Sequence, residues 1–185
     1  MTGIDYARVC EQLVTAVREA GRIIEDQWKK PREISHKGRI DIVTQTDLAV
    51  EKALKESLGK ILPQAGFLGE ESAGAPKPEQ LSELCWVVDP LDGTVNYAHS
   101  LPVIAVSVGL WHQGAIRAGV VYNPLMNELF HASEGKGAYL NGESIQVSGA
   151  SELKDCVVAT GFPYTIRERV DEILSWMRRV LFQCQ

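Results

Sequence analysis

One short run in the middle of the chain, from Trp86 to Asn96, constrains the fold most. It begins with three strand-favouring apolar residues and continues directly into Asp89-Pro90-Leu91-Asp92-Gly93-Thr94. This pattern predicts a buried strand that delivers two carboxylates to a loop. A strand end followed by a turn can hold carboxylates rigidly and close together, as a hard cation such as Mg²⁺ requires of its oxygen ligands. The run therefore predicts a metal site.

The chain as a whole has the composition of a globular protein. Its 185 residues are enough for a substantial core and indicate one large domain or one and a half. The formal net charge of -5 argues against a dedicated nucleic-acid binder, although local basic patches remain open. No apolar run approaches the length of a membrane span, and the N-terminus lacks a signal-peptide core, so we expect a cytoplasmic location and no membrane contact.

The cysteines and histidines do not form a recognisable ligand set. No C-x-x-C pair is present, so the sequence indicates neither a zinc cluster nor a disulfide framework. We expect the cysteines to be small buried apolar residues and the histidines to serve packing or the surface. These residues are Cys10, Cys85, Cys156, Cys184, His36, His99, His112 and His131.

The N-terminal third predicts two amphipathic helices. Apolar residues recur three or four apart from Ile4 to Trp28, and again from Leu48 to Ile61. Asp47 stands where the N-cap of the second helix belongs, and on this stretch alone its carboxylate would serve only the backbone. A strand is expected within Ile34 to Thr44.

The second acidic motif follows a short strand at Phe67-Leu68. Gly69-Glu70-Glu71-Ser72 could be solvated surface charge, but the apolar residues before it bring Glu70 to a strand end. We expect a loop from Ala73 to Glu79 and a turn of helix around Leu81 to Leu84.

The next part of the chain predicts an antiparallel meander with short turns, among which Asn141-Gly142 is a strong hairpin signal. The expected strands are Val103–Trp111, Ile116–Tyr122, Glu128–Ala132, Ala138–Leu140 and Ile145–Val147.

A boundary is expected near Ser148 to Lys154, which gives an N-terminal α+β domain over residues 1–150 and the beginning of an α/β domain over 151–185. Cys156 to Thr160 predicts a buried strand and Ile166 to Leu181 a helix. The fold class is layered α+β, with two helices against an antiparallel sheet. An α/β unit that ends after one strand and one helix leaves apolar surface uncovered, so we expect this unit to be incomplete.

Four acidic residues thus stand at the ends of elements: Asp47, Glu70, Asp89 and Asp92. The chain has no nucleophile elbow, Walker loop or G-x-G-x-x-G motif, and carboxylates with few His or Cys companions favour Mg²⁺ or Mn²⁺ over zinc. The turn at Gly93 exposes N–H groups that can hold a phosphate. Together these features indicate metal-assisted phosphoryl chemistry with an activated water as the nucleophile.

Three motifs now resemble the inositol monophosphatase family, bacterial members included. They are Asp41-Ile42-Val43-Thr44-Gln45-Thr46-Asp47, Gly69-Glu70-Glu71-Ser72 and Asp89 through Asn96, and the turn Gly161-Phe162-Pro163 extends the resemblance over essentially the whole chain. It implies the layered sandwich that sugar phosphatases share, from inositol monophosphatase to fructose-1,6-bisphosphatase. Val95 and Tyr97 stand where Thr and Phe are commoner in the family.

The resemblance implies roles for individual residues. Glu70, Asp89 and the carbonyl of Leu91 would hold a first Mg²⁺, Asp89 and Asp92 a second, and Glu70 could assist a third. Mn²⁺ could replace Mg²⁺, and Li⁺ would inhibit. Asp47 and Thr94 would act in catalysis by orienting the attacking water. The substrate's phosphate would be bound by Asp92, Gly93 and Thr94.

The implied activity is hydrolysis of myo-inositol monophosphate, a small phosphorylated polyol, by a homodimer. Fructose-bisphosphatase and 3′-phosphonucleotide phosphatase activities remain alternatives, as do an inactive fragment and a non-catalytic accessory role in contact with the transcription machinery. Family members continue with a Trp-Asp motif whose aspartate completes the second metal site. This motif is missing from the sequence, and we therefore expect a truncated chain.

Overall fold

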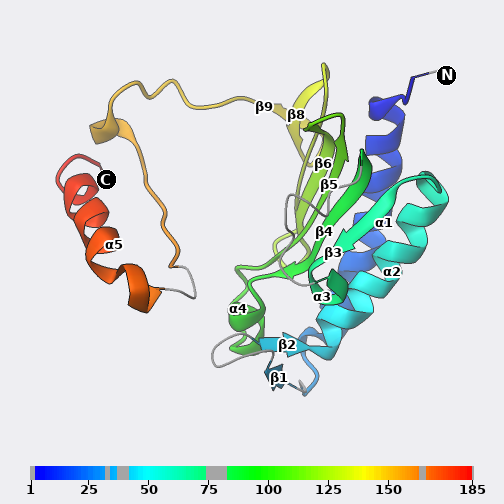
Figure 1. The fold of residues 1–185 in the computed structure, drawn as a ribbon, viewed down its shortest axis with the longest axis horizontal. Coiled ribbons are helices and arrows are strands. Elements are labelled where there is room, and N and C mark those ends of the chain that lie inside the picture. The colour runs from blue at the N-terminus through cyan, green and yellow to red at the C-terminus, as the bar shows by residue number, and fades with distance from the viewer. Residues whose placement is uncertain (1–2, 32–33, 37–41, 74–82, 163–165, 185) are drawn as a thin grey trace. The chain divides into compact units, whose positions relative to one another are not determined.

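The computed structural model describes residues 3–31, 34–36, 42–73, 83–162 and 166–184 (Figure 1). The chain divides into two compact units. The first comprises residues 1–37 and 42–145, and the second comprises residues 38–41 and 146–185. All candidate site residues belong to the first unit.

Two helices form one layer of the first unit. Helix α1 spans Tyr6–Trp28, and it begins two residues after the predicted start because the Asp5 side chain caps it by accepting a hydrogen bond from the backbone of Arg8. Helix α2 spans Gln45–Ile61, three residues longer at its start than predicted. The two helices pack side by side along one face of the sheet (Figure 1).

The predicted N-cap of α2 is wrong. The cap is Thr44, and Asp47 occupies the third helical position. The two residues form a capping box. The Thr44 side chain accepts a hydrogen bond from the backbone at the third helical position, and the Asp47 side chain accepts one from the backbone N–H of Thr44. Both Thr and Asp are common N-cap residues, so the sequence pattern placed the start of α2 three residues too late.

Seven strands form the sheet in the order β3-β4-β5-β6-β7-β8-β9. Strands β5 to β9 form the predicted antiparallel meander. Strand β4 joins it by pairing antiparallel with β5, while β3 pairs with β4 in parallel. A separate hairpin pairs β1 with β2. The bounds are β1 Ile34–His36, β2 Ile42–Thr44, β3 Gly66–Gly69, β4 Leu84–Asp92, β5 Ala105–His112, β6 Ala115–Asn123, β7 Glu128–Ser133, β8 Gly137–Leu140 and β9 Glu143–Ile145.

Some expected boundaries differ from the structure. Val103 and Val147, expected in strands, lie outside them and are 68% and 97% exposed. Leu84 begins β4 instead of ending a helical turn, and Ala73 ends the short helix α3, Glu70–Ala73. The rest of the loop and helical turn expected there lies in residues 74–82, outside the described ranges.

The core lies between the helices and one face of the sheet. Leu13, Ile24 and Leu54 from the helices are fully buried against Trp86 and Leu110 from the strands. Burial of a large apolar side chain stabilises the fold by roughly 1.5–3 kcal/mol. This layer therefore holds β3 and β4, and the residues at their ends, in a fixed position.

The opposite face of the sheet carries apolar side chains that remain partly exposed in this unit. Ile116, Val121 and Phe130 are 53%, 43% and 38% exposed. Together with neighbouring residues they line a groove of about 800 Å³, and Glu70 and Asp89 also line it.

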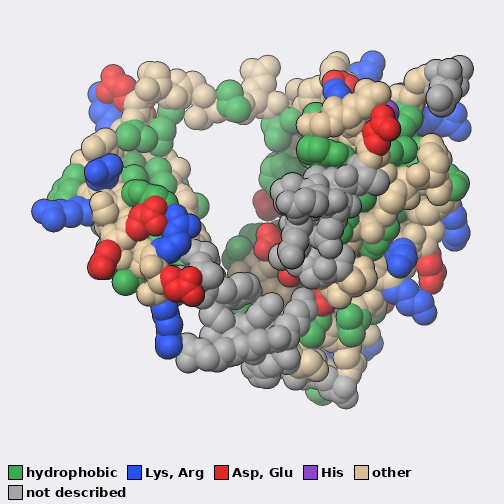
Figure 2. Space-filling model, viewed as in Figure 1, with side chains coloured by type: hydrophobic (Ala, Val, Ile, Leu, Met, Phe, Trp, Pro, Cys, Tyr) green, Lys and Arg blue, Asp and Glu red, His purple; other side chains and the backbone are tan. Residues whose placement is uncertain are grey.

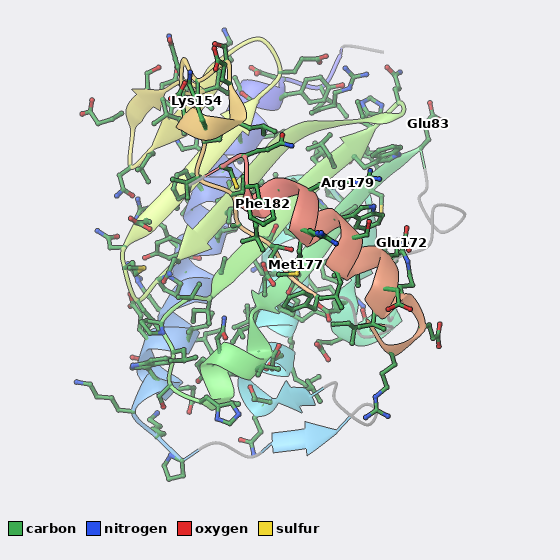
Figure 3. All side chains as sticks on the ribbon, turned by 90° about the vertical axis from the view of Figure 1, so that its left-hand side faces the viewer. Glu83, Lys154, Glu172, Met177, Arg179 and Phe182 are labelled. Carbon is green, nitrogen blue, oxygen red and sulfur yellow. The ribbon has the colours of Figure 1, made fainter. Side chains whose placement is uncertain are left out.

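The second unit is built mainly on one helix. Helix α5 spans Ile166–Leu181, as predicted, and Ile173 is its buried residue. Figure 2 shows acidic, basic and hydrophobic side chains mixed on the surface of this unit, and Figure 3 shows Glu172, Met177 and Arg179 projecting from α5 with Phe182 just beyond it.

The predicted strand at Cys156 to Thr160 is wrong. The segment has no regular secondary structure, and Val157 is 86% exposed. It follows a short 3₁₀ turn, Leu153–Asp155. Among the described residues of this unit no other extended segment pairs with it, and an isolated strand cannot satisfy its own backbone groups. Pro163 of the predicted turn lies outside the described residues.

None of the helices described in this structure combines the length and the apolar character needed to cross a bilayer.

Candidate functional site

Strand topology brings the two acidic motifs together. Strand β3 runs parallel to β4, and Gly69 lies beside Val88 in the register. The next residues, Glu70 and Asp89, therefore emerge at the same end of the sheet, where α3 and α4 (Thr94–Ala98) follow the two strands (Figure 1). Parallel pairing is the physical reason that carboxylates nineteen positions apart become neighbours.

Asp89 and Asp92 lie within the last residues of β4 and not in a loop after it, which corrects the prediction. The pairing with β5 is irregular here: Asp89 lies opposite Ser107, and Asp92 lies opposite Ala105. Between these two pairs β4 advances by three residues and β5 by two, so β4 contains one extra residue, as in a β-bulge. The extra residue lets the strand present both carboxylates near its end.

The carboxyl groups of Glu70 and Asp89 interact with each other and line the same groove. The pKa of Asp89 is raised to about 8. Burial is the largest cause, and the negative charges of Glu70 and Asp92 come next. The backbone N–H of Leu91 donates to Asp89 Oδ1 at 3.1 Å and opposes this shift. The charged form of Asp89 is therefore disfavoured, and a nearby cation would offset the negative charges around it.

Asp47 and Thr94 form a second, more buried cluster. Asp47 is 1% exposed, and its Oδ2 accepts hydrogen bonds from the backbone N–H and the hydroxyl of Thr44. Its Oδ1 lies 3.0 Å from Thr94 Oγ1, which is also 3.0 Å from the carbonyl oxygen of Leu91. The single hydroxyl proton of Thr94 can serve one of these acceptors at a time. Asp47 thus completes the capping box of Thr44 at the start of α2 and also contacts Thr94.

Gly93 makes the turn between β4 and α4. Its φ is +90°, and a Cβ at this position would lie 2.8 Å from the carbonyl oxygen of Val103. Glycine is required here both for the left-handed backbone and for the close approach. The turn leads into a helix start, as predicted.

Two contacts that the sequence did not single out support the site. The Tyr97 hydroxyl lies 3.0 Å from Thr46 Oγ1, both buried, and so joins α4 to the start of α2. Glu51 is 6% exposed, and its Oε2 accepts a hydrogen bond from the backbone of Glu71 at 2.8 Å. The signal for Glu51 was its spacing of four from Asp47, which places both on one face of the helix.

The oxygen donors at the end of β4 fit a hard divalent cation. Glu70 and Asp89 supply adjacent carboxylates, Leu91 a carbonyl, and Asp92 an exposed carboxylate on the same stretch. In the described part of the chain, no three Asp, Glu, His or Cys side chains converge on one ready-made metal position. The fit therefore rests on the oxygen chemistry and on the burial and neighbouring negative charges that raise the pKa of Asp89, since a cation would offset those charges.

The histidines and cysteines serve other contacts. His112 Nδ1 lies 2.7 Å from the Tyr6 hydroxyl, and the ring of His131 stacks on that of Tyr139. Cys10 and Cys85 are buried free thiols, as predicted. Cys156 and Cys184 are partly exposed, so the expectation of burial is wrong for these two.

Comparison with known proteins identifies the family of the chain. A sequence model of the inositol monophosphatase family matches residues 5–182. The chain belongs to this family. The layered α+β fold agrees with that assignment.

Relatives in the family come from plants and bacteria. Inositol monophosphatase 2 of Solanum lycopersicum is 42% identical over 174 residues, which cover 92% of this chain and 65% of the relative. Nus factor SuhB of Escherichia coli K12 is 36% identical over 173 residues, which cover 92% of this chain and 64% of the relative. The crystal structure of the extragenic suppressor protein suhB from Bartonella henselae is 39% identical with a TM-score of 0.87, over 96% of this chain and 68% of that one.

The chain spans between about half and two thirds of the length of the curated relatives it matches.

Proposed function

We propose that the protein is a Mg²⁺-dependent phosphomonoesterase that hydrolyses myo-inositol monophosphate. The observation that carries the proposal is the placement of two clusters on one stretch of chain. The carboxylate pair of Glu70 and Asp89 stands at one end of Asp89–Thr94, and the hydrogen bond between Asp47 and Thr94 stands at the other. Membership of the inositol monophosphatase family supports the choice of substrate.

The metal ligands are assigned by donor chemistry and by the family motif. Glu70, Asp89 and the Leu91 carbonyl hold a first cation, Asp89 and Asp92 hold a second, and Glu70 assists a third where one binds. When bound, the ions supply charge neutralisation at the phosphate and polarise a water. Asp92 lies at the exposed edge of the set, so it is assigned to the side of the leaving group.

The remaining residues orient the reactants. Thr94 donates its hydroxyl proton to Asp47 Oδ1, which leaves the lone pairs of Thr94 Oγ1 free to accept a hydrogen bond from the attacking water. Asp92, Gly93 and Thr94 bind the phosphate through the turn at the start of α4. Because Asp47 is held by Thr44 as well, the acceptor is fixed before substrate arrives.

Phosphate release from a panel of substrates tests the proposal. The purified chain, with Mg²⁺, is offered inositol monophosphate, fructose 1,6-bisphosphate and a 3′-phosphonucleotide. We expect inositol monophosphate to be turned over fastest and Asp89→Asn to abolish that turnover. Faster release from either other substrate would change the substrate assignment, and equal activity in Asp89→Asn would remove the metal site from the mechanism.

A second candidate is an accessory role in transcription, which the match to proteins named Nus factor SuhB favours. Affinity capture with the tagged chain distinguishes the two functions. Stoichiometric recovery of RNA polymerase by a chain that hydrolyses none of the panel would support the accessory role. A homodimer is proposed on the family resemblance alone, and light scattering during size-exclusion chromatography tests it.

A further inference from the structure

Glu51 is a buried carboxylate to which the proposed chemistry gives no role. It lies in α2, one helical turn after Asp47, and is only 6% exposed. Carboxylates are almost never buried to this extent unless a partner compensates the loss of water. Among the residues that the structure describes, Glu51 has no salt bridge to a lysine or arginine. Within the described residues, Glu51 is compensated by another kind of donor.

That donor is the backbone beside the proposed metal ligand. Glu51 Oε2 accepts a hydrogen bond from the N–H of Glu71 at 2.8 Å. This N–H belongs to the first turn of α3, where helix N–H groups have no partner within the helix. The bond is charge-assisted and bridges twenty positions of sequence, so it ties α2 firmly to the turn after β3.

The carboxylate of Glu51 also lies beside Gly69, the residue on the other side of Glu70. A Cβ at Gly69 would lie 2.4 Å from Glu51 Oε2 and 2.6 Å from Glu51 Cδ. The glycine at position 69 therefore leaves the space that the carboxylate of Glu51 occupies. Glu51 contacts the residue before Glu70 and bonds the residue after it, which leaves the backbone of Glu70 little freedom.

The backbone of Glu70 in turn decides where its side chain points. The parallel pairing of β3 with β4 brings Glu70 and Asp89 to the same end of the sheet, where both line one groove, and their carboxyls are the adjacent donors of the proposed metal site. A shift of the Gly69–Glu71 turn would separate them. Partners that orient metal ligands without touching the metal typically contribute 10–100-fold to metal affinity.

We propose that Glu51 is a positioning residue of the metal site, which holds the Gly69–Glu71 turn so that the Glu70 carboxylate meets that of Asp89. The inference rests on the proposed function, because it assumes that Glu70 and Asp89 bind the cation. It assigns Glu51 no contact with metal or substrate.

Calorimetric titration of the full chain with Mn²⁺ tests the inference without recourse to activity. We expect Glu51→Ala to weaken Mn²⁺ binding by at least about tenfold. Glu51→Gln retains an acceptor oxygen of the same reach and should stay within about threefold of the unsubstituted chain. Glu56→Ala removes an exposed glutamate from the same helix, and as the matched control it should bind Mn²⁺ normally.

Amide hydrogen exchange of the peptide covering residues 67–73 provides a second readout. Its exchange should accelerate in Glu51→Ala and remain slow in Glu51→Gln. Should Glu51→Ala fail to fold, Glu51→Asp takes its place, because the shorter side chain keeps the charge but withdraws the acceptor.

The outcomes separate the two proposals. An unsubstituted chain that binds no Mn²⁺ would overturn the proposed function and this inference with it. Normal Mn²⁺ binding in folded Glu51→Ala or Glu51→Asp, beside weakened binding in Asp89→Asn, would overturn the role of Glu51 alone.

Discussion

The two clusters at the ends of the Asp89–Thr94 stretch differ in how their carboxylates are stabilised. Asp47 is nearly fully buried, yet each of its oxygens has donors: Thr44 on one side and the Thr94 hydroxyl on the other. Asp89 faces another carboxyl, that of Glu70, and its pKa is raised to about 8. One carboxylate is satisfied by the protein, and the other needs a proton or a cation.

The difference teaches that burial by itself does not determine the cost of a carboxylate. Hydrogen bonds to the charged form stabilise it, and a neighbouring like charge destabilises it. The cluster at Asp47 is therefore organised for its task before any ligand binds. Under the proposed function, the pair at Asp89 would be stabilised by binding a cation.

The sharpest way to break this contrast is Asp89→Asn. Because it removes a direct donor, we expect Mn²⁺ affinity to fall by at least about 100-fold, more than the loss of an orienting partner. The metal-free protein should lose no stability, because the substitution also removes charge repulsion. Calorimetric titration and thermal unfolding without metal measure the two effects. A clear fall in the metal-free Tm would contradict the view that Asp89 is destabilised by its neighbours.

Asp47→Ala, unlike Asp89→Asn, should lower the stability of the metal-free chain. It leaves the buried donors of Thr44 and the half-buried hydroxyl of Thr94 without their acceptor, so we expect the free energy of unfolding to fall by about 1–3 kcal/mol. Urea denaturation of the metal-free chain measures this loss. Asp47→Asn, which keeps one acceptor oxygen, serves as the control and should lose less. Equal stability of Asp47→Ala and the unsubstituted chain would mean that the cluster is not held by these bonds.

The stability of the metal-free chain should depend on pH through Asp89. Its pKa is raised from 3.8 to about 8, so between these values the folded state binds more protons than the unfolded state. Stability is therefore lost as pH rises across this window and changes no further above it. We expect this group to make Tm fall as pH rises through the window, and its contribution to be absent in Asp89→Asn. A Tm that instead rises with pH through the window, to the same extent in both proteins, would contradict the assignment.

The smallest expected effect is that of Tyr97→Phe. The variant keeps the buried ring but removes the hydroxyl that lies 3.0 Å from Thr46 Oγ1. We expect a loss of about 0.5–1.5 kcal/mol in unfolding free energy, with Mn²⁺ affinity unchanged. Chemical denaturation measures the stability, and calorimetric titration measures the Mn²⁺ affinity. A Mn²⁺ affinity that fell with the stability would show that the two clusters are coupled through α4.

Regular periodicity made much of the fold predictable. Helix α5 has the predicted bounds, and the meander follows from short strands separated by turn residues such as Asn141-Gly142. The pattern failed at Cys156–Thr160, because an apolar run forms a strand only where another strand accepts its hydrogen bonds. It failed at Thr44 too, where a capping box offers two residues that can cap.

The candidate site residues stand out in the sequence, but the residues that support them do not. Asp47, Glu70 and Asp89 are conspicuous as acidic residues at the ends of apolar runs, and the structure brings Glu70 to Asp89. Glu51 looks like any polar residue of an amphipathic helix, and only the path of the chain after β3 reveals that it is buried. The roles assigned to all of these residues stay predictions until the titrations are done.

The parallel pairing of β3 with β4 has a kinetic consequence. The meander closes through neighbouring hairpins, whereas the contacts around the site join residues twenty and forty-seven positions apart. Contacts between distant residues carry a larger entropy of loop closure and tend to form late. We therefore expect substitutions at Glu51 and Asp47 to accelerate unfolding while leaving the folding rate nearly unchanged. Stopped-flow measurement of both rates would show whether the carboxylates assemble only after the sheet that carries them.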